Sequence, residues 1–481
     1  MYLKSVRMYR YRKEINHMEV FMKYKSIPRI QHLIPTVFLI LLLSLQSVFA
    51  ATKAEIDTYS AHIPELFADA PELASESAIL VDIDSGAIIY AKNPTRSMYP
   101  ASTTKLMTAY LTLKYCQLDD IVTYSKKAIL SLEPGSSHIG LKAGESLTVE
   151  DSLYGLLLPS ANEAANGLAE HVSGSISAFA NLMNEEAASL GCVNTNFANA
   201  NGLHDPNHMT CAYDLYLIME ACIRQNDFIR IASDTAYMRY ADDVLNKDIP
   251  MGTTNQFLKK DSEFYDKTVI CGKTGWTEQA GRCLVTYAIR NDMNLICVVM
   301  NSKSPNQYTD TQLLLNYAER NFQSVRPYDQ DTQLNTDSLR ADTPLGISED
   351  TVSLMELDAS SRILLPNSVT FSDLTRKMTE NADGSHTITY KLDGYPLGTV
   401  NLIQQSEDNS QIGLWNDTRS TSGLLSALDI TRLHTVNVWL VLAIAAAILL
   451  LAILLILIIR IMMAPKEPPA HEEEEHHYHF L

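Results

Sequence analysis

Residues 77–110 read SAILVDIDSGAIIYAKNPTRSMYPASTTKLMTAY. Two apolar runs flank Asp84-Ser85-Gly86, a turn signal, so the stretch begins with a predicted β-hairpin. After Pro100 the apolar residues recur three and four apart, which predicts a helix over Lys105–Tyr115. The sequence therefore predicts a hairpin followed by a helix, with Ser102 and Lys105 at the start of the helix.

The chain that follows the first predicted helix is rich in helical periodicity and then returns to strands. Further helices are expected over residues 149–158, 161–172, 176–190, 212–223 and 309–322. Strands are expected over residues 268–271, 283–289 and 295–300. Strands at both ends of one domain with helices between them predict an α/β (α+β) fold, in which an antiparallel sheet is covered by helices.

The residue pattern changes after Val325 from helical spacing to a linker and then to alternation. Pro, Asp and Thr form a linker, and period-two segments follow at Val352–Glu356, His386–Leu392 and Thr399–Gln404. We therefore expect a catalytic domain over residues 51–325, a small all-β domain over 326–408 and a membrane-proximal linker over 409–435.

Both ends of the chain carry membrane-related signals. Residues 1–50 combine a basic region, an apolar run and Val48-Phe49-Ala50, the pattern of a secretory signal peptide. Residues 436–459 are uncharged and, at 1.5 Å per residue, span about 36 Å as a helix, enough to cross a bilayer. These signals predict an extracytoplasmic body, a C-terminal transmembrane helix and a cytoplasmic tail over 460–481, whose Glu and His residues we expect to be solvated.

The composition excludes some function classes. The formal net charge is −18, with 38 Lys+Arg against 56 Asp+Glu, so nucleic acid is not the expected partner. Seven cysteines without a C-x-x-C pair indicate neither a zinc module nor a dense disulfide scaffold. An extracytoplasmic body has no access to cytosolic ATP or NAD(P)H, and we expect no cofactor and no metal.

The motif S-x-x-K occupies residues 102–105, at the start of the first predicted helix. Residues three apart share a helix face, so the Lys105 amine is expected beside the Ser102 hydroxyl. Unpaired backbone N–H groups at a helix start favour developing negative charge. A lysine held in a water-poor cleft near other cations loses its proton readily and can activate the serine as a nucleophile.

Two further triplets can contribute to the same chemistry. Ser160-Ala161-Asn162 lies just ahead of a predicted helix, where a hydroxyl can relay a proton and an amide can bind a substrate amide. Lys273-Thr274-Gly275 lies on a predicted strand and supplies a charge, a hydroxyl and a residue without a side chain, which lets a substrate approach the strand edge.

The order S-x-x-K, S-x-N, K-T-G is the signature of penicillin-interactive serine enzymes. Four segments extend the match: the opening stretch quoted above, GLLLPSANEAANGLAEHV, NGLHDPNHMTCAYDLYLI and CGKTGWTEQAGRCLVTYA. Over roughly residues 60–325 the chain resembles the low-molecular-weight penicillin-binding proteins, the D-alanyl-D-alanine carboxypeptidases of the penicillin-binding protein 5/6 type. The resemblance implies a serine β-lactamase/transpeptidase-like domain, and the β-rich domain and membrane anchor also match that family's arrangement.

The resemblance implies a catalytic role for three residues. Ser102 attacks the carbonyl between the two terminal D-alanines of a peptidoglycan stem peptide and is acylated, while Lys105 takes its proton. Ser160 passes a proton to the departing D-alanine. β-Lactam antibiotics would acylate the same serine and leave slowly.

The resemblance implies a substrate-binding role for five residues. Asn162 orients the substrate and Lys105, while Lys273 and Thr274 bind the terminal carboxylate, and Lys273 helps keep Lys105 neutral. Gly275 allows close approach, and the backbone N–H groups of Trp276 and Ser102 hold the oxyanion.

Three positions depart from the family pattern or leave a choice open. Relatives often carry an Arg after the strand that follows K-T-G, where this chain has only Lys303, and Arg282 is a candidate substitute. His204 and His208 lack the Glu of H-E-x-x-H, so a structural loop role is expected rather than zinc binding. Cys271 and Cys283 either form a disulfide or remain thiols.

Several functions share this scaffold. A class A β-lactamase needs a deacylating Glu in an E-x-x-L-N pattern between S-x-N and K-T-G, and no convincing one is found there. A penicillin-binding sensor would not need the full residue set. A D,D-endopeptidase uses the same chemistry and stays an alternative to the carboxypeptidase.

Overall fold

The computed structural model describes residues 53–54, 56–58, 69–131, 133–331, 339–340, 354–381 and 384–404. Within these ranges, no helix combines the length and the apolar character needed to cross a membrane. The predicted signal peptide (1–50), linker (409–435), transmembrane helix (436–459) and tail (460–481) lie outside the described residues.

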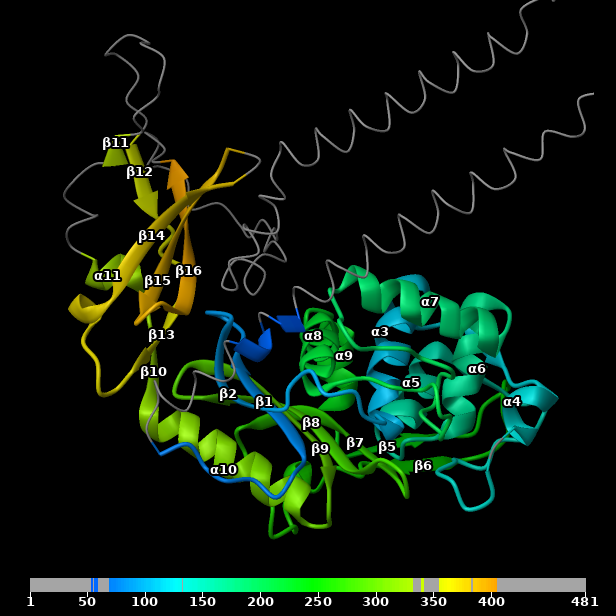
Figure 1. Ribbon diagram of the computed structural model, residues 1–481. Coiled ribbons are helices and arrows are strands. Elements are labelled where there is room, and N and C mark those ends of the chain that lie inside the picture. Colours follow the sequence, from blue (N-terminus) through cyan, green and yellow to red (C-terminus); the bar gives the residue numbers. More distant parts are fainter. Residues whose placement is uncertain are drawn as a thin grey trace, which may run out of the picture. The chain divides into compact units, whose positions relative to one another are not determined.

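The core of the catalytic region is a five-stranded antiparallel sheet with the order β2-β1-β9-β8-β7 (Figure 1). Its strands are β1 (Ser77–Asp82), β2 (Ala87–Lys92), β7 (Val269–Thr277), β8 (Gly281–Arg290) and β9 (Met293–Ser302). The hairpin of β1 and β2 therefore pairs, through β1 and β9, with strands about 200 residues later in the sequence. The predicted sheet, closed by both ends of one domain, is confirmed.

The sheet forms here because its central strands are continuous apolar runs. All six residues of β1 are buried, and Leu80 lies opposite Cys297 of β9. A fully buried Ile, Leu or Val contributes roughly 1.5–3 kcal/mol relative to an exposed one, so this strand pair is a main source of stability. The turn between β1 and β2 closes at Gly86, which has a φ of +72°.

Helices cover both sides of the sheet. Figure 1 shows α8 on one side and α10 on the other, and both pack against β9. A second layer, formed by α3, α5, α6, α7 and α9, packs beyond α8. The helices are α3 (Lys105–Tyr115), α4 (Lys126–Leu130), α5 (Val149–Leu157), α6 (Asn162–Ser173), α7 (Ile176–Ser189), α8 (Ala212–Ile223), α9 (Asn226–Ala232) and α10 (Asn306–Asn321).

Short elements connect these layers. Two small antiparallel pairs are β3 (Ile121–Thr123) with β4 (Ser146–Thr148), and β5 (Ala236–Arg239) with β6 (Ile249–Gly252). Two 3-10 turns are η1 (Ala101–Thr104), directly ahead of α3, and η2 (Gln256–Leu258). These segments have only three or four residues each, too few for an apolar pattern to indicate a strand or a turn, and the sequence does not predict them.

The region after α10 is mainly β-structure. A second five-stranded sheet has the order β11-β12-β16-β15-β14. Its strands are β11 (Leu339–Arg340), β12 (Leu354–Leu357), β14 (Thr375–Glu380), β15 (His386–Leu392) and β16 (Tyr395–Gln404). Separately, β10 (Phe322–Val325) pairs with β13 (Ile363–Pro366), while α11 (Pro327–Gln330) and η3 (Phe371–Asp373) are single short turns.

Each helix or strand predicted within the described residues is found as a helix or strand in the structure, and most differ from the prediction only at their ends. The helices over Lys105–Tyr115 and Ala212–Ile223 have the predicted bounds, while β7, β8 and β9 are longer than predicted because their polar end residues still pair. The pairing of β10 with β13 crosses the predicted domain boundary after residue 325. The boundaries themselves stay predictions.

Candidate active site

The nucleophile candidate lies in a constrained turn. Ser102 is in η1, and Lys105 is the first residue of α3. Ala101, just before the serine, has a φ of +49°, a left-handed conformation that non-glycine residues seldom adopt. The Thr104 hydroxyl donates to the Ala101 carbonyl at 2.8 Å, which holds this turn in place.

A buried histidine supports the same turn. The Nδ1 atom of His208 accepts a hydrogen bond from the backbone N–H of Ala198 at 2.9 Å, so its Nε2 carries the hydrogen. Nε2 lies 2.7 Å from the Thr104 hydroxyl and donates to it. Burial lowers the pKa of His208 to about 4, so the ring is neutral. His208 therefore has the expected structural role, and His204 packs edge-on against Tyr99.

Lys105 is fully buried, with three polar partners. Its Nζ lies 3.0 Å from the Ser102 Oγ, 2.7 Å from the Asn162 Oδ1 and 2.7 Å from the Asn201 backbone carbonyl. Burial lowers the pKa of Lys105 well below its ordinary value, the Lys273 charge lowers it further, and Glu163 opposes both effects.

The partners of Lys105 fix the direction of the hydrogen bonds when the amine is neutral. A neutral amine has two hydrogens and one lone pair. The oxygens of Asn162 and Asn201 can only accept, so they take both hydrogens. The lone pair then faces Ser102, whose hydroxyl donates to Nζ. This arrangement is the one that a general base needs.

Ser160 and Lys273 form a second buried pair beside the first. The Lys273 Nζ donates to the Ser160 Oγ at 2.9 Å and to the Thr274 carbonyl at 3.0 Å. Burial lowers the pKa of Lys273 to about 7. Ser160 has a φ of +65°, in the turn before α6, and Asn162 is the first residue of that helix.

Two glycines bring other backbone segments against the nucleophile turn. A Cβ at Gly275 would lie 3.0 Å from the Pro100 carbonyl oxygen and 3.1 Å from the Ser102 nitrogen. A Cβ at Gly202, whose φ is +84°, would lie 1.9 Å from the Ala101 carbonyl oxygen. The loop with Asn201 therefore approaches the nucleophile turn only because Gly202 has no side chain. At Gly275 a side chain would make a tight contact with this turn, so glycine lets the edge of β7 lie against it without strain.

The outer rim of the site comes from β7 and β8. The Thr274 hydroxyl shares a hydrogen bond of 2.6 Å with the Thr254 hydroxyl. Trp276 is 58% exposed, and the Arg282 guanidinium lies 5.2 Å above its ring. Arg282 is thus at the same end of the strand pair as Trp276, directly opposite it in register.

The structure brings together the three predicted motifs. Lys105 contacts Ser102 and Asn162, and Lys273 contacts Ser160. Two residues of the site, Asn201 and Thr254, are not indicated by any sequence motif. Asn201 contacts Lys105 through its backbone carbonyl, and Thr254 contacts Thr274 through its hydroxyl. Asn201 begins the segment NGLHDPNHMTCAYDLYLI, which resembles the penicillin-binding proteins, and this likeness is the only indication in the sequence that Asn201 belongs to the site.

The disulfide alternative for Cys271 and Cys283 is wrong in this structure, where both are free thiols. In the register of β7 and β8, Cys271 lies opposite Tyr287, while Cys283 lies opposite Gly275. The two positions are four residues apart along the strands, beyond the reach of an S–S bond. Cys211 is fully buried, as expected of a packing residue.

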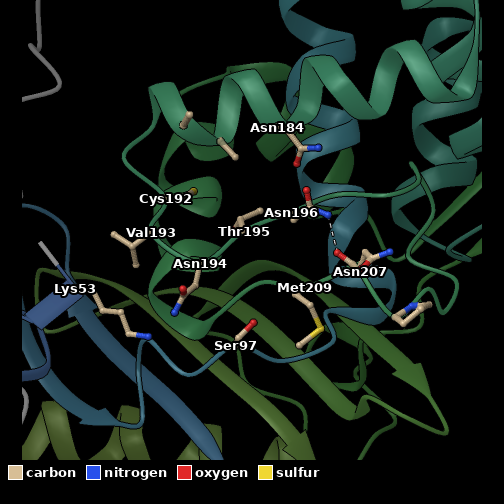
Figure 2. Close-up of a pocket in the computed structure, with 13 residues that line it drawn as sticks. Lys53, Ser97, Asn184, Cys192, Val193, Asn194, Thr195, Asn196, Asn207 and Met209 are labelled. Atoms are coloured by element: carbon tan, nitrogen blue, oxygen red, sulfur yellow. Dashed lines mark hydrogen bonds between the residues drawn. The ribbon is translucent and has the colours of Figure 1, made fainter. Parts of the chain in front are cut away.

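A hollow of about 740 Å³ is lined by the end of α7 and the loop that follows it (Figure 2), and none of the predicted catalytic residues lines it. Two asparagines of its lining already have hydrogen-bond partners. Asn184 exchanges hydrogen bonds with the Phe197 backbone, and Asn196 donates to the Asn207 carbonyl at 2.6 Å. These hydrogen bonds hold the loop that leads to Asn201 in place, so we assign the residues around the hollow a structural role.

The fold and the site define a serine enzyme of the penicillin-interactive class. Residues 65–304 match the family model described as D-alanyl-D-alanine carboxypeptidase. The chain is 32% identical over 286 residues to the D-alanyl-D-alanine carboxypeptidase DacC of Escherichia coli, covering 58% of this chain and 69% of the relative. The chain belongs to the D-alanyl-D-alanine carboxypeptidase family of serine peptidases.

Other relatives and solved structures agree with this membership. DacF of Bacillus subtilis, another D-alanyl-D-alanine carboxypeptidase, is 33% identical over 243 residues, which cover 49% of this chain and 60% of that protein. The match therefore spans less than two thirds of the Bacillus relative. Penicillin binding protein 5 from Haemophilus influenzae is similar in structure, with a TM-score of 0.56, 28% identity and coverage of 69% of this chain and 97% of that one.

Proposed function

We propose that the protein is a serine-type D-alanyl-D-alanine carboxypeptidase that removes the terminal D-alanine from peptidoglycan stem peptides. The observation that carries this proposal is the environment of Lys105, a buried amine whose lone pair is directed at Ser102 by two carbonyl acceptors. Family membership supplies the substrate class. β-Lactams, which resemble the D-alanyl-D-alanine terminus, are the expected covalent inhibitors.

In the acylation step, Lys105 accepts the Ser102 proton while the Oγ attacks the carbonyl between the two D-alanines. The oxyanion is stabilised by the backbone N–H groups of Ser102 and Trp276. As the C–N bond breaks, the Ser160 hydroxyl passes a proton to the leaving nitrogen and is resupplied from Lys273, 2.9 Å away. Free D-alanine leaves, and the peptide remains esterified to Ser102.

In the deacylation step, water takes the place of the departed D-alanine. Before this step Lys105 gives up to solvent the proton that it took from Ser102, and Lys273 regains one, so that the Lys105 amine is neutral again. Lys105 then removes a proton from the water as its oxygen attacks the ester carbonyl, and the proton passes to the Ser102 oxygen when the ester C–O bond breaks. Among the described residues, no carboxylate has a hydrogen bond to Ser102 or Lys105. This favours a peptidase over a β-lactamase, which needs a carboxylate to activate the deacylating water.

Substrate binding is assigned to residues of β7 and β8 and to the first residue of α6. The terminal carboxylate is bound by Lys273 and the Thr274 hydroxyl, while Asn162 orients the peptide. Arg282, held over the Trp276 ring, supplies the outer positive charge. Gly275 leaves room for the substrate along the edge of β7.

We place the enzyme outside the cytoplasm, anchored by the predicted helix over residues 436–459. The signal-peptide pattern at residues 1–50 and the apolar run support this placement. Peptidoglycan lies on the same side of the membrane, so a tethered enzyme would meet its substrate there.

The function is tested by incubating the full chain with a peptide that ends in D-Ala-D-Ala and assaying free D-alanine. The carboxypeptidase releases one D-alanine per peptide and forms a long-lived penicilloyl adduct. Penicillin labelling without D-alanine release would overturn the carboxypeptidase assignment in favour of an endopeptidase or a sensor. Rapid turnover of the penicillin would indicate a β-lactamase.

A further inference from the structure

A group of three potential metal ligands lies outside the catalytic site. They are Cys116, which caps the end of α3, Asp120 in the turn after it, and His171 in the last turn of α6. One ligand atom from each, a sulfur, a carboxylate oxygen and a ring nitrogen, lies within 4.8 Å of the other two. Among the described residues, no other group of His, Cys, Asp and Glu meets this criterion.

The backbone holds the Cys116–Asp120 turn in position. The Cys116 N–H donates to the Thr112 carbonyl at 2.9 Å, and the Val149 N–H donates to the Asp120 carbonyl at 2.8 Å. One carboxylate oxygen of Asp120 accepts the Gln117 N–H at 2.8 Å. In the described part of the chain, the second oxygen, the thiol and the His171 ring have no hydrogen-bond or ion-pair partner and are available as ligands.

We infer that Cys116, Asp120 and His171 form a site for a divalent transition metal ion, with zinc as the best match. Thiolate, imidazole and carboxylate are the three ligand types that zinc takes in proteins, at about 2.0–2.3 Å from the metal. Tetrahedral ligands at those distances lie about 3.3–3.7 Å apart. Side-chain rotations that move each ligand atom by about 1 Å would therefore bring the three atoms within bonding distance of one ion. Water fills the fourth position, and the thiol proton is released to solvent on binding.

The position of the site gives it a structural role. Both α3 and α6 begin at the catalytic centre, where the Lys105 Nζ and the Asn162 Oδ1 are 2.7 Å apart. Both helices end at the metal ligands, and they pack against each other along the way (Figure 1). At 1.5 Å per residue, the ligands lie about 15 Å from Lys105. The ion would therefore clamp the far ends of the two helices that carry Lys105 and Asn162, without touching the reacting atoms.

The test uses Co²⁺ as a probe in the full chain after removal of metals with a chelator. A cysteine ligand gives Co²⁺ an intense sulfur-to-metal absorption band in the near ultraviolet, which the histidines of the C-terminal tail cannot produce. We expect this band to saturate at one equivalent and to disappear on addition of Zn²⁺. It should be absent in Cys116→Ser and at least tenfold harder to saturate in His171→Ala and Asp120→Asn.

Two controls separate this site from other metal binding. Cys192→Ser removes a thiol from another part of the domain, and His476→Ala alters the tail; both should keep the band. A thermal unfolding scan supplies a second readout, because Zn²⁺ should raise the Tm of the wild type and not that of Cys116→Ser. No band in the wild type, or an equal band in Cys116→Ser, would overturn the inference. Circular dichroism of each variant verifies that it is folded, independently of the proposed peptidase activity.

Discussion

The Nζ of Lys105 lies 3.0 Å from the Ser102 Oγ, and its other two contacts are oxygens that can only accept hydrogen bonds. A lysine in this position has one way to be neutral, with its lone pair toward the serine. Burial and the Lys273 charge both lower the pKa of Lys105 well below its ordinary value, which favours the neutral amine that a base needs.

Replacement of Lys105 by Ala should slow penicillin acylation by about 10²–10⁴-fold, the usual contribution of a general base. The cavity is lined by carbonyl oxygens that water can satisfy, so the fold should persist. Stopped-flow or quenched acylation assays measure the rate, and circular dichroism checks the fold. A rate near wild type would show that Lys105 is not the base.

Replacement of Asn162 by Asp places a negative charge 2.7 Å from the Lys105 Nζ. This charge stabilises the ammonium form and raises the pKa of Lys105, so the acid limb of the acylation profile should move to higher pH. The matched control is Asn162→Ala, which removes the hydrogen bond without adding a charge. An unshifted acid limb in Asn162→Asp would mean that Lys105 does not control acylation.

Replacement of Gly202 by Ala should disrupt the nucleophile turn. The new Cβ would lie 1.9 Å from the Ala101 carbonyl oxygen, at a φ of +84°. We expect a loss of stability of about 1–3 kcal/mol and a large fall in the acylation rate. Gly191→Ala is a matched control, because Gly191 has the same φ of +84° and a Cβ there would have no other atom within 4 Å. Equal acylation rates in the two variants would contradict the close-approach argument.

Stability should depend on pH through Lys273. Burial lowers its pKa to about 7 in the folded protein, against 10.5 for an ordinary lysine. Between these values the unfolded chain binds a proton that the folded chain does not. The free energy of unfolding should therefore rise with pH across this window, by up to about 1.4 kcal/mol per pH unit, and the gain is lost as pH falls toward 7.

Lys273→Met is the variant that checks this pH dependence, since it has no titrating group. Denaturant unfolding at about pH 7.5 and about pH 9.5 should show a smaller gain in stability for the variant than for the wild type. The same gain in both proteins would show that Lys273 is charged throughout this range in the folded state.

Much of this site could be predicted from the sequence because its residues lie at regular structural positions. The spacing of Ser102 and Lys105 needs only a helix start, and the strand pattern places Lys273 and Thr274 on one strand. What joins them is long-range. No local pattern indicates that the Asn201 carbonyl meets Lys105, or that Gly202 must have no side chain to let the loop approach Ala101.

The same limit applies to the fold and to the proposed metal site. The long apolar strands and helices were predicted, but β3–β6 have three or four residues each and are defined by their partners rather than by their own sequence. Cys116 and His171 are 55 residues apart in sequence, and only the packing of α3 against α6 brings them together. His208 could be noticed in the sequence, but its hydrogen bond to Thr104 could not.

The most direct test of the central claim is to locate the penicilloyl group on the protein. The full chain is labelled with penicillin, digested and analysed by mass spectrometry, with Ser102→Ala and Ser160→Ala treated in parallel. We expect the added mass on Ser102 alone, no label in Ser102→Ala, and slower labelling at the same residue in Ser160→Ala. A label on Ser160, or a label that persists in Ser102→Ala, would contradict the assignment of Ser102 as the nucleophile.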